Sequence, residues 1–534
     1  MKKIALLLPD TVDKYTRNLI AALEKIKEAE LLLIQLQPSL ASHNIHEISY
    51  NLLWKAERKI VSRISEEVRE FLIPDTTFHY THPLITFNIV TDNSTGTISL
   101  KEHDYTYLKE KTLDLIIDCD TSRNLDYTTL STCSKDGIVG IFYNHKIAFK
   151  EVCYRKDRIP FTIKNIVSKN SKLLFSGEIA TFRLITETQA RIMKESFPYL
   201  LQQITHYLIQ NSFIPHPNAT EYQFTHHIPT VFEQFNYLTK TASLYTELVI
   251  RRLFLKQYTR FSVAFAFTDQ TQTFSTKVLS KGIQIQPPAN HFYADPFVWT
   301  KKGRHVCFLE DYDYTKQIAW ISAVEIFEDG HYEILGEVIR EPFHLSFPYL
   351  FEYEDELYMI PESSAANSIR LYKCIDFPMQ WEFQKELRSG IKAADTMLFA
   401  HEGKWWMLTN QTTENNADQA AQLFVYHNDS PLKSEGWQPH PLNPVVFSSD
   451  GGRNGGILLQ KDKLPVRVGQ RQRFNIYGAA FCLNQITQLT ETHYKEERIA
   501  EIEPNFFPGL RATHHMHAHN GIIVYDFMKY RKLD

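Results

Sequence analysis

Three residues that could share one reaction centre stand at the same early position of three similar segments. Asp295 lies in ADPF, Asp395 in ADTM and Arg453 in GRNGG. Two carboxylates can divide the acid, base and electrostatic roles at a glycosidic bond, and a guanidinium binds phosphate oxygens in pairs. Each aspartate could equally bond to the backbone of a turn, as repeated aspartates often do. The pattern predicts a polar centre, provided that the fold brings these distant residues together.

A dense run of histidines offers a second set of reactive side chains, namely His514, His515, His517 and His519. If the run is a strand, alternation sends the last three to one face, where they could hold a metal ion. Histidines of a strand can also line a channel or face solvent. We expect this second role and predict no metal site.

These residues belong to a unit that recurs through the second half of the sequence. Each copy has a small polar entry, an apolar strand, a turn and a second, aromatic strand. The copies lie at 294–311, 346–363, 393–410, 452–470 and 513–527. Their markers, Asp295, Phe347, Asp395, Arg453 and His514, are 52, 48, 58 and 61 residues apart. Periods near 50 residues indicate propeller blades, whereas a single irregular β-sandwich would not need the repeat. We therefore predict a five-bladed β-propeller whose inner strands converge on one funnel.

The first part of the sequence alternates apolar strands with helical periods. The predicted strands are 4–8, 31–36, 113–118 and 137–142, and the predicted helices are 15–30, 46–71 and 190–210. This alternation predicts a doubly wound, Rossmann-like sheet. A connection follows, and it ends in a helix near 243–256. The predicted class is α/β plus all-β, with an α/β domain at 1–215, a helical linker at 216–258 and the propeller at 259–534.

Length and composition narrow the function classes. The 534 residues exceed the roughly 250–300 at which single cores stop growing, so at least two domains are expected. The net charge of −4 gives no reason to expect a nucleic-acid partner. Six widely spaced cysteines without a CxxC pair favour a reduced, cytoplasmic protein. The sequence has no apolar run of about 18 residues, so we expect no transmembrane segment, and peripheral association with a membrane is left open.

Segment 290–527 resembles the propeller module of the glucosamine inositolphosphorylceramide transferase family and its bacterial relatives. The motifs that carry the resemblance are YADPF (293–297), HLSFPYLF (344–351), YMIPES (358–363), FPMQW (377–381), AADTMLF (393–399), HPLNPV (440–445), GRNGG (452–456), VGQ with a later YG (468–470, 477–478) and the LT…Y…E run at 489–497. The module is similar to five-bladed glycoside hydrolases of family 43. This similarity implies a base at Asp295, a tuning carboxylate at Asp395 and a channel position for His514 or His515. The general acid of those hydrolases belongs in the fourth blade, where this sequence has Arg453.

Loss of a general acid costs about 10² to 10⁴ in rate, so the resemblance implies glycosyl transfer rather than hydrolysis. A nucleotide sugar brings its own leaving group, and Asp295 would then deprotonate a hydroxyl of a glycan acceptor. Asp395 would position the substrate, and Glu362 would serve as a substitute acid or bind a sugar hydroxyl. The predicted function is assembly of a glycan or surface polysaccharide. A propeller that binds glycans without turnover is the alternative.

Further residues are expected to contact the substrate. Arg453, Arg467 and Gln470 would hold the diphosphate of the donor. Trp405 and Trp406 could stack on a sugar ring, although aromatic pairs in propeller strands more often belong to the blade core. The predicted substrate-binding set is Arg453, Asn454, Arg467, Gln470, His344, Trp405 and His514.

The first 215 residues resemble a worn copy of a formyltransferase domain, through KIALLL, LDLIID and GIVGIFYNH. Such enzymes transfer a formyl group from a folate cofactor to an amine with an Asn, a His and an Asp. Here His145 matches the histidine, and Tyr143 stands where the Asn is expected. The Asp is expected in a later loop, which reads LLFSGEI here and has Phe175 in its place. The resemblance thus implies a degenerate centre without folate binding, although Glu178 could compensate. A sugar N-formyltransferase remains the rival function.

Overall fold

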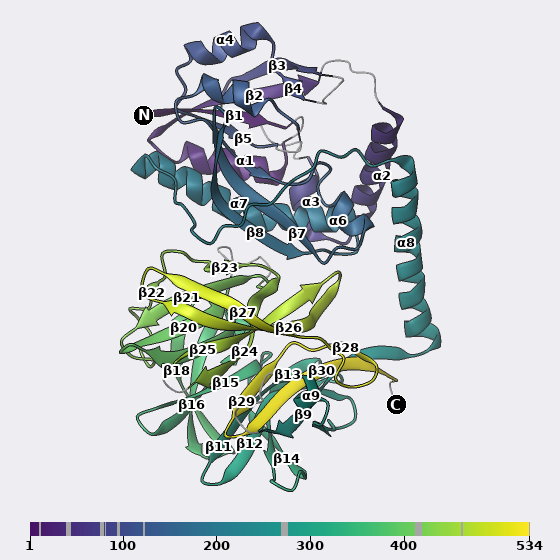
Figure 1. Cartoon of the computed structure of the whole chain (residues 1–534), viewed down its shortest axis with the longest axis vertical. Helices are drawn as coiled ribbons and strands as arrows, with labels where there is room; N and C mark the ends of the chain where they lie inside the picture. The colour runs from purple at the N-terminus through teal and green to yellow at the C-terminus, as the bar shows by residue number, and fades with distance from the viewer. Residues whose placement is uncertain are drawn as a thin grey trace. The chain divides into compact units, whose positions relative to one another are not determined.

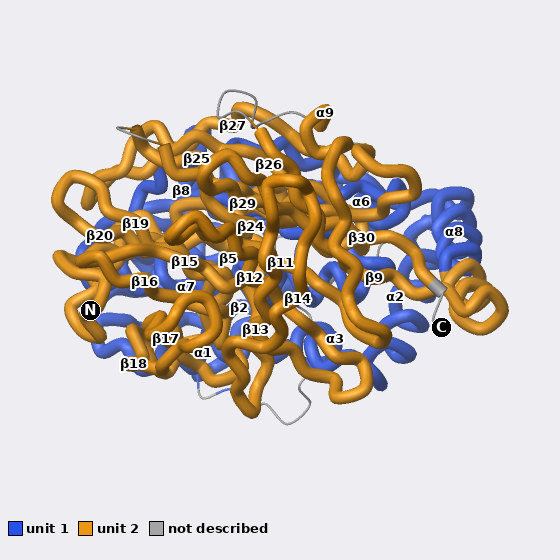
Figure 2. Tube along the Cα trace, turned by 90° about the horizontal axis from the view of Figure 1, so that it is seen from below, with its two compact units in different colours: residues 1–244 blue, residues 245–534 orange. Residues whose placement is uncertain are grey.

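The computed structural model describes residues 1–9, 12–38, 44–74, 80, 82–92, 97–120, 123–268, 276–411, 419–460 and 463–532. The chain divides into two compact units, residues 1–244 and 245–534, which Figure 2 shows in different colours. Helix α8 (Val231–Val249) runs across the boundary between their residue ranges. None of the helices in the described ranges is both long and apolar enough to span a membrane.

Unit 1 is an α/β domain built on a mixed sheet (Figure 1). In the described part of the chain the sheet runs in the order β4-β3-β2-β1-β5-β6-β7-β8. Its strands are β1 (Lys2–Leu8), β2 (Ala29–Pro38), β3 (Leu84–Thr91), β4 (Ile98–Ser99), β5 (Leu115–Asp118), β6 (Ile138–Phe142), β7 (Arg158–Val167) and β8 (Asn170–Ala180). The run β3-β2-β1-β5-β6 is parallel, whereas β4, β7 and β8 are antiparallel additions. The parallel core has the strand order of a doubly wound sheet.

Helices pack against this sheet and bury its central strands. They are α1 (Lys14–Glu24), α2 (Ile45–Val61), α3 (Glu66–Leu72), α4 (Glu102–Glu110), α5 (Tyr127–Leu130), α6 (Phe149–Cys153) and α7 (Ile185–Gln210). Ile4, Leu6 and Ile116 have no exposed surface, as expected for central strands that are covered on both faces. The apolar runs in the sequence predicted four of the described parallel strands, β1, β2, β5 and β6, whereas the fifth, β3, was not predicted.

The predicted helix 46–71 is wrong as a single helix, because it is broken between α2 and α3. The Ser65 hydroxyl accepts a hydrogen bond of 3.3 Å from the Val68 N–H and so starts α3 as a new helix. The predicted helix 15–30 ends earlier, at Glu24, because β2 already begins at Ala29.

The connecting helix begins well before the predicted position near residue 243. Thr230 and Glu233 form a capping box in which the Glu233 N–H donates to Thr230 Oγ1 (3.2 Å) and the Thr230 N–H donates to Glu233 Oε2 (2.8 Å). Helix α8 therefore starts at Val231, and a π-helical turn, Ile250–Phe254, follows it. The TVFE sequence was the signal that periodicity alone overlooked.

Unit 2 is a five-bladed propeller, as predicted. Within the described residues the blades are five antiparallel sheets. Blade 1 comprises β11 (His291–Lys301), β12 (Arg304–Asp313), β13 (Ile318–Ile326) and β14 (Tyr332–Ile339). Blade 2 comprises β15 (Ser346–Tyr353), β16 (Glu356–Glu362), β17 (Ser368–Asp376) and β18 (Gln380–Ser389). Blade 3 comprises β19 (Ala394–His401), β20 (Lys404–Asn410), β21 (Gln422–Asn428), β22 (Gln438–Pro439) and β23 (Val446–Phe447). Blade 4 comprises β24 (Asp450–Gln460), β25 (Lys463–Arg473), β26 (Ile476–Leu489) and β27 (Tyr494–Ile502).

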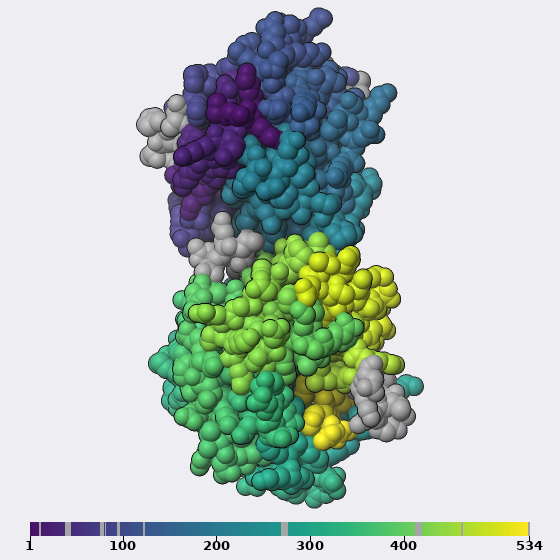
Figure 3. All heavy atoms as spheres, turned by 90° about the vertical axis from the view of Figure 1, so that its left-hand side faces the viewer, coloured from purple at the N-terminus to yellow at the C-terminus, as the bar shows by residue number. Residues whose placement is uncertain are grey.

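Blade 5 joins strands from the two ends of the unit. It comprises β28 (Leu510–Ala512), β29 (Met516–His519), β30 (Ile522–Lys532), β9 (Gln257–Phe267) and β10 (Ile283–Ile285), with the short helix α9 (Thr276–Leu279) between β9 and β10. Strand β30 pairs with β9 along all 11 residues of each (Figure 1). In Figure 3, green atoms from the middle of the chain and yellow atoms from its C-terminal part pack side by side within the unit. The ring is therefore closed by backbone hydrogen bonds between distant segments.

Three blades carry the same irregularity at the start of their first strand. The pairing skips two residues between Ala294 and Phe297, between Ser346 and Tyr349, and between Ala394 and Met397. In each gap one residue has a left-handed backbone: Asp295 at φ 48°, Phe347 at φ 44° and Asp395 at φ 47°. Such conformations cost roughly 1–3 kcal/mol each and tend to occur at functional sites. The sequence markers of the repeat are these strained residues.

The seam between blades 5 and 1 is held by histidine side chains. The N–H of Val298 donates to His517 Nδ1 (3.3 Å), and the N–H of Thr300 donates to His519 Nδ1 (3.1 Å). Burial lowers the pKa of His517 to about 3 and that of His519 to about 4. These rings therefore act as neutral acceptors that join β29 to β11, rather than as a metal-binding set.

We predict that acid weakens the propeller through this seam. A histidine in the unfolded chain titrates near 6.5, so the unfolded state binds more protons than the folded state between about pH 6.5 and pH 3–4. Stability is then lost as the pH falls through that window, by about 1.4 kcal/mol per pH unit and histidine at most. His517→Asn retains an acceptor oxygen near the Nδ1 position but does not titrate. Its unfolding free energy should fall less steeply between pH 6 and 4 than that of the wild type, and equal slopes would contradict the assignment.

Candidate functional site

The centre of the propeller contains a largely buried ion-pair cluster from blades 2, 3 and 4. Arg453 Nε lies 2.7 Å from Asp395 Oδ2, and Arg453 Nη2 lies 3.4 Å from Asp395 Oδ1 and 3.3 Å from Glu362 Oε2. Asp395 is 1% exposed. The structure thus brings together three residues that are up to 91 positions apart in the chain. It also places Glu362, the predicted substitute acid, next to Asp395, the predicted tuning carboxylate.

Glu362 is the carboxyl of this cluster whose pKa is raised most strongly. Burial and the negative charge of Asp395 raise the pKa of Glu362 well above its usual range. Arg453 makes its shorter, two-point contact with Asp395, which favours Asp395 as the anion of the pair. A carboxylic acid that stays protonated at neutral pH can donate a proton to a leaving oxygen.

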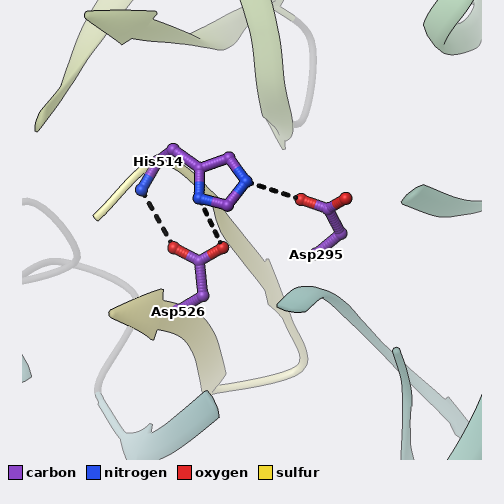
Figure 4. A group of neighbouring side chains, drawn as sticks. All are labelled: Asp295, His514 and Asp526. Atoms are coloured by element: carbon purple, nitrogen blue, oxygen red, sulfur yellow. Dashed lines mark hydrogen bonds and ion pairs between the residues drawn. The ribbon is translucent and has the colours of Figure 1, made fainter. Parts of the chain in front are cut away.

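Asp295 belongs to a second cluster, in which His514 lies between two carboxylates (Figure 4). His514 Nε2 is 3.1 Å from Asp295 Oδ1, and His514 Nδ1 is 2.8 Å from Asp526 Oδ2. The backbone N–H of His514 also donates to Asp526 Oδ1 (2.9 Å). All three residues are buried, and Asp526 has no exposed surface. The arrangement orients the imidazole so that one nitrogen faces the proposed base.

The charge of His514 follows from its neighbours. Burial lowers the pKa of this ring, but the charge of Asp526 and the contacts with Asp295 and Asp526 outweigh it and raise the pKa to about 10. The ring is therefore an imidazolium near neutral pH. Asp295, His514 and Asp526 each offer a ligand atom within 4.8 Å of the others, so they are a candidate metal group. Because each ring nitrogen already faces a different carboxylate, the geometry suits a proton relay better than chelation of one ion.

Asn454 and Gln470 hold the Asp395 cluster in place. The Asn454 side chain donates to the Asp395 backbone oxygen (2.9 Å), and Gln470 Nε2 donates to Asp395 Oδ2 (3.2 Å). The Asn454 N–H also donates to Asn410 Oδ1 (2.8 Å). Both side chains are buried, so they position the carboxylate from behind.

Arg467 does not lie where a phosphate could reach it. Its side chain has no exposed surface and contacts Glu496 through two nitrogens, at 2.8 and 2.5 Å. It also donates to the Gly451 backbone oxygen (2.7 Å) and to Asn454 Oδ1 (3.3 Å). Its role is thus to support Asn454 and the glycine-rich strand β24, and the predicted diphosphate contact does not fit its position.

Glycines let the inner strands come close enough to form this centre. A Cβ on Gly455 would lie 2.2 Å from the His514 backbone oxygen, and one on Gly456 would lie 2.2 Å from that of Met516. No side chain fits in either place. The glycines of the GRNGG motif therefore allow the backbone of β24 to lie directly against the segment that contains His514.

The remaining predicted residues have mixed positions. His344 Nε2 lies 3.1 Å from Glu310 Oε1, and the charge of Asp295 acts on both partners, which places this pair beside the relay. Trp405 packs edge-on against Phe351 and Tyr353 at centroid distances of 5.6 Å, so it belongs to the contact between blades 2 and 3. The predicted stacking role does not fit that position.

The residues aligned with a formyltransferase centre each contact a different partner in unit 1. Tyr143 Oη is 2.6 Å from Ser196 Oγ, and His145 stacks on His226 at 3.7 Å. Phe175, expected in a loop, lies within strand β8 and stacks on Tyr199 at 4.5 Å. The possible substitute Glu178 is paired with Arg158, at 3.2 Å. Tyr143 also lines a cavity with Tyr15, Asp118 and Cys119.

Two residues of the centre were missed by sequence reasoning. Asp526 lies on β30, the hairpin partner of β29, and pairing across that hairpin would have placed it opposite the histidine run. Tyr477 lies in the YG motif beside both Arg453 and His514, and its ring centroid is 5.4 Å from Arg453 Cζ. The motif had been noted without a role.

The propeller part of the chain is similar to known proteins. Residues 278–521 match the family described as "Glucosamine inositolphosphorylceramide transferase 1, N-terminal". Curated proteins with the name "Glucosamine inositolphosphorylceramide transferase 1" are 33% identical over 212 residues in Oryza sativa subsp. japonica and over 215 residues in Arabidopsis thaliana. These alignments cover 39% and 40% of this chain, whereas the chain spans 28% of the length of each relative.

Solved structures with partial likeness include a family 117 glycoside hydrolase, Zg3597, from Zobellia galactanivorans, with 10% identity and a TM-score of 0.33 over 52% of this chain and 92% of that one. An exo-1,5-alpha-L-arabinanase from a bovine ruminal metagenomic library has 13% identity and a TM-score of 0.31, covering 44% and 87%. The resemblance that the sequence motifs suggested is confirmed by the family match: the propeller of this chain is similar to the N-terminal region of glucosamine inositolphosphorylceramide transferase 1.

Proposed function

We propose that the propeller centre catalyses glycosyl transfer from a nucleotide-activated sugar to a hydroxyl of a glycan acceptor. The observation that carries this proposal is that Asp295, paired with His514, and Glu362, whose pKa is raised well above its usual range, lie in two neighbouring clusters of the propeller. Asp295 takes the proton of the acceptor hydroxyl, and His514, held by Asp526, stabilises the charges beside it. The transferase name of the relatives supports the same reaction class.

Glu362 completes this mechanism at the other side of the sugar. In its protonated form it gives a proton to the leaving oxygen of the donor, and Asp395 and Arg453 hold it there. Asp395 pairs with Arg453 through Nε, and Arg453 Nη2, which contacts the uncharged Glu362, would bind a phosphate oxygen of the donor. We further propose that the reaction takes place in the cytoplasm, and that unit 1 is a degenerate formyltransferase-like scaffold that binds no folate.

Glu362→Gln tests the acid role directly. Glutamine keeps the size and the hydrogen bond to Arg453 but carries no transferable proton, so kcat should fall by about 10² with a nucleotide sugar. Purified chain is incubated with a panel of nucleotide sugars and oligosaccharide acceptors, and free nucleotide is measured. Glu356→Gln, at the outer end of the same strand, should behave like the wild type. An unchanged kcat for Glu362→Gln would overturn the acid assignment.

Glycan binding without turnover is the second candidate. It is favoured because the matched region is the N-terminal part of relatives of which this chain spans 28%, so their transferase chemistry can reside elsewhere. In that case calorimetry shows that the chain binds an oligosaccharide, and the assay shows no release of nucleotide from any nucleotide sugar in the panel. Release of nucleotide that depends on the acceptor would exclude this candidate.

A further inference from the structure

Tyr477 stands out because it is a large aromatic side chain that remains 45% exposed beside a buried polar centre. It lies at the start of β26, after the left-handed residue Asn475. Its ring centroid is 5.4 Å from Arg453 Cζ, and its edge contacts the His514 ring at a centroid distance of 5.7 Å. It is therefore adjacent to both clusters of the site.

The next residue explains how Tyr477 comes so close. Gly478 has φ +55°, and a Cβ there would lie 2.6 Å from His514 Cβ. The Gly478 N–H donates to Gln472 Oε1 (2.8 Å), and its carbonyl accepts from the Thr513 N–H (3.1 Å). The YG pair is thus fixed by its backbone against the histidine segment, which leaves the ring of Tyr477 little freedom to move away.

Other aromatic rings also lie close to His514. Phe261 contacts the His514 ring at 4.6 Å, and Phe292 stacks on Tyr312 at 4.8 Å and contacts Phe261 at 6.4 Å. Of these rings, Tyr477 alone belongs to the exposed large hydrophobic residues of the described chain. His514 therefore has aromatic neighbours, and Tyr477 is the most exposed of these rings.

An exposed aromatic ring beside carboxylates and a guanidinium can bind both the apolar and the polar parts of a sugar. The C–H face of a pyranose packs on an aromatic ring, while its hydroxyls bond to charged groups. The Arg453 guanidinium lies within cation–π distance of the ring and holds it in place. The Tyr477 hydroxyl can donate or accept a hydrogen bond with a sugar hydroxyl.

We propose that Tyr477 is the stacking platform for the pyranose ring that binds at the propeller centre, and hence a specificity-determining residue. The proposal rests on the proposed function, because it assigns the sugar-binding surface of the same site. The substrate class it selects is a hexopyranose with an unsubstituted C–H face that can lie flat on the ring. The role predicted for Trp405 thus falls to a residue from another blade.

Three variants test the platform. Tyr477→Ala should weaken binding of a sugar about tenfold, whereas Tyr477→Phe, which keeps the ring, should bind within about threefold of the wild type. Phe383→Ala, which removes an exposed aromatic on the outer strand β18, is the control and should not change binding. The probes are methyl pyranosides of glucose, galactose, mannose and N-acetylglucosamine, together with the nucleotide sugars of the same residues, titrated by calorimetry.

The kinetic readout separates stacking from chemistry. For any donor that is turned over, Tyr477→Ala should raise KM about tenfold and change kcat little. Equal binding by the wild type, Tyr477→Ala and Tyr477→Phe would overturn the platform even if turnover is seen. Loss of binding in Tyr477→Ala in a chain that consumes no donor would support the platform and overturn glycosyl transfer. Weaker binding in both Tyr477 variants would show that the hydroxyl, rather than the ring face, makes the contact.

Discussion

Asp295→Asn is expected to lower kcat for glycosyl transfer by about 10³-fold or more while the chain folds normally. An amide cannot take the proton of an acceptor hydroxyl, and a positioned base accounts for about 10² to 10⁴ in rate. Asparagine tolerates the left-handed backbone at this position, φ 48°, better than most residues, so the bulge of β11 should persist. The amide also keeps an oxygen that can face His514. The loss is measured as nucleotide release at saturating donor and acceptor.

The matched control is Asp329→Asn in the exposed turn between β13 and β14, where the side chain is 71% exposed. It makes the same chemical change on the same blade, so its kcat should match that of the wild type. Thermal unfolding of both variants shows whether the fold is retained. Full turnover by Asp295→Asn would remove Asp295 as the base, and the relay of His514 and Asp526 would then have no catalytic partner.

Arg467→Met should destabilise the propeller by about 3–5 kcal/mol. The substitution leaves Glu496 without its two-point partner and strips the Gly451 carbonyl and Asn454 of a donor in a region without water access. Removing one member of a buried pair is costly because the other charge stays behind. The effect is measured by urea unfolding of the propeller, followed by tryptophan fluorescence. Arg467→Met/Glu496→Gln together should recover part of the loss, since no buried charge is left unpaired.

Arg473→Met provides the comparison, because Arg473 pairs with Glu503 and both side chains are about one third exposed. A pair of that kind contributes less than about 1 kcal/mol. If Arg467→Met were as mild as Arg473→Met, Arg467 would not be the structural support described above. Its predicted phosphate contact would then deserve a direct test by titration with a nucleotide diphosphate.

Much of the propeller could be predicted because the same short sequence pattern recurs at the start of its blades. Asp295, Phe347 and Asp395 recur because the same bulge needs a residue in the same left-handed conformation in three blades. Arg453 and His514 mark the fourth and fifth blades, although His514 lies two residues before β29. Spacing near 50 residues therefore gave the number of blades and the convergence of their inner strands.

The chemistry of the centre was harder to predict, since it depends on which side chains neutralise each other. Arg467 and Arg453 look alike in sequence, yet one has no exposed surface and the other contacts both carboxylates of the centre. Asp526 and Tyr477 join the site through contacts across strands, which no single repeat unit encodes. In unit 1, Phe175 lies in a strand because β7 and β8 form a hairpin where the resemblance implies a loop.

The pairing of β9 with β30 also determines when the propeller can close during synthesis. Strand β9 leaves the ribosome well before β30, and about 250 residues of blades must wait without an edge partner until the later strand emerges. During that interval the unpaired edge of β9 exposes backbone hydrogen-bond donors and acceptors, which can pair with a strand of another protein chain. The described strands of segment 1–244 pair only with one another, and the whole segment has been synthesised before β9. Because unit 1 precedes unit 2 in the sequence, unit 1 can fold first, before β30 pairs with β9 and closes the propeller.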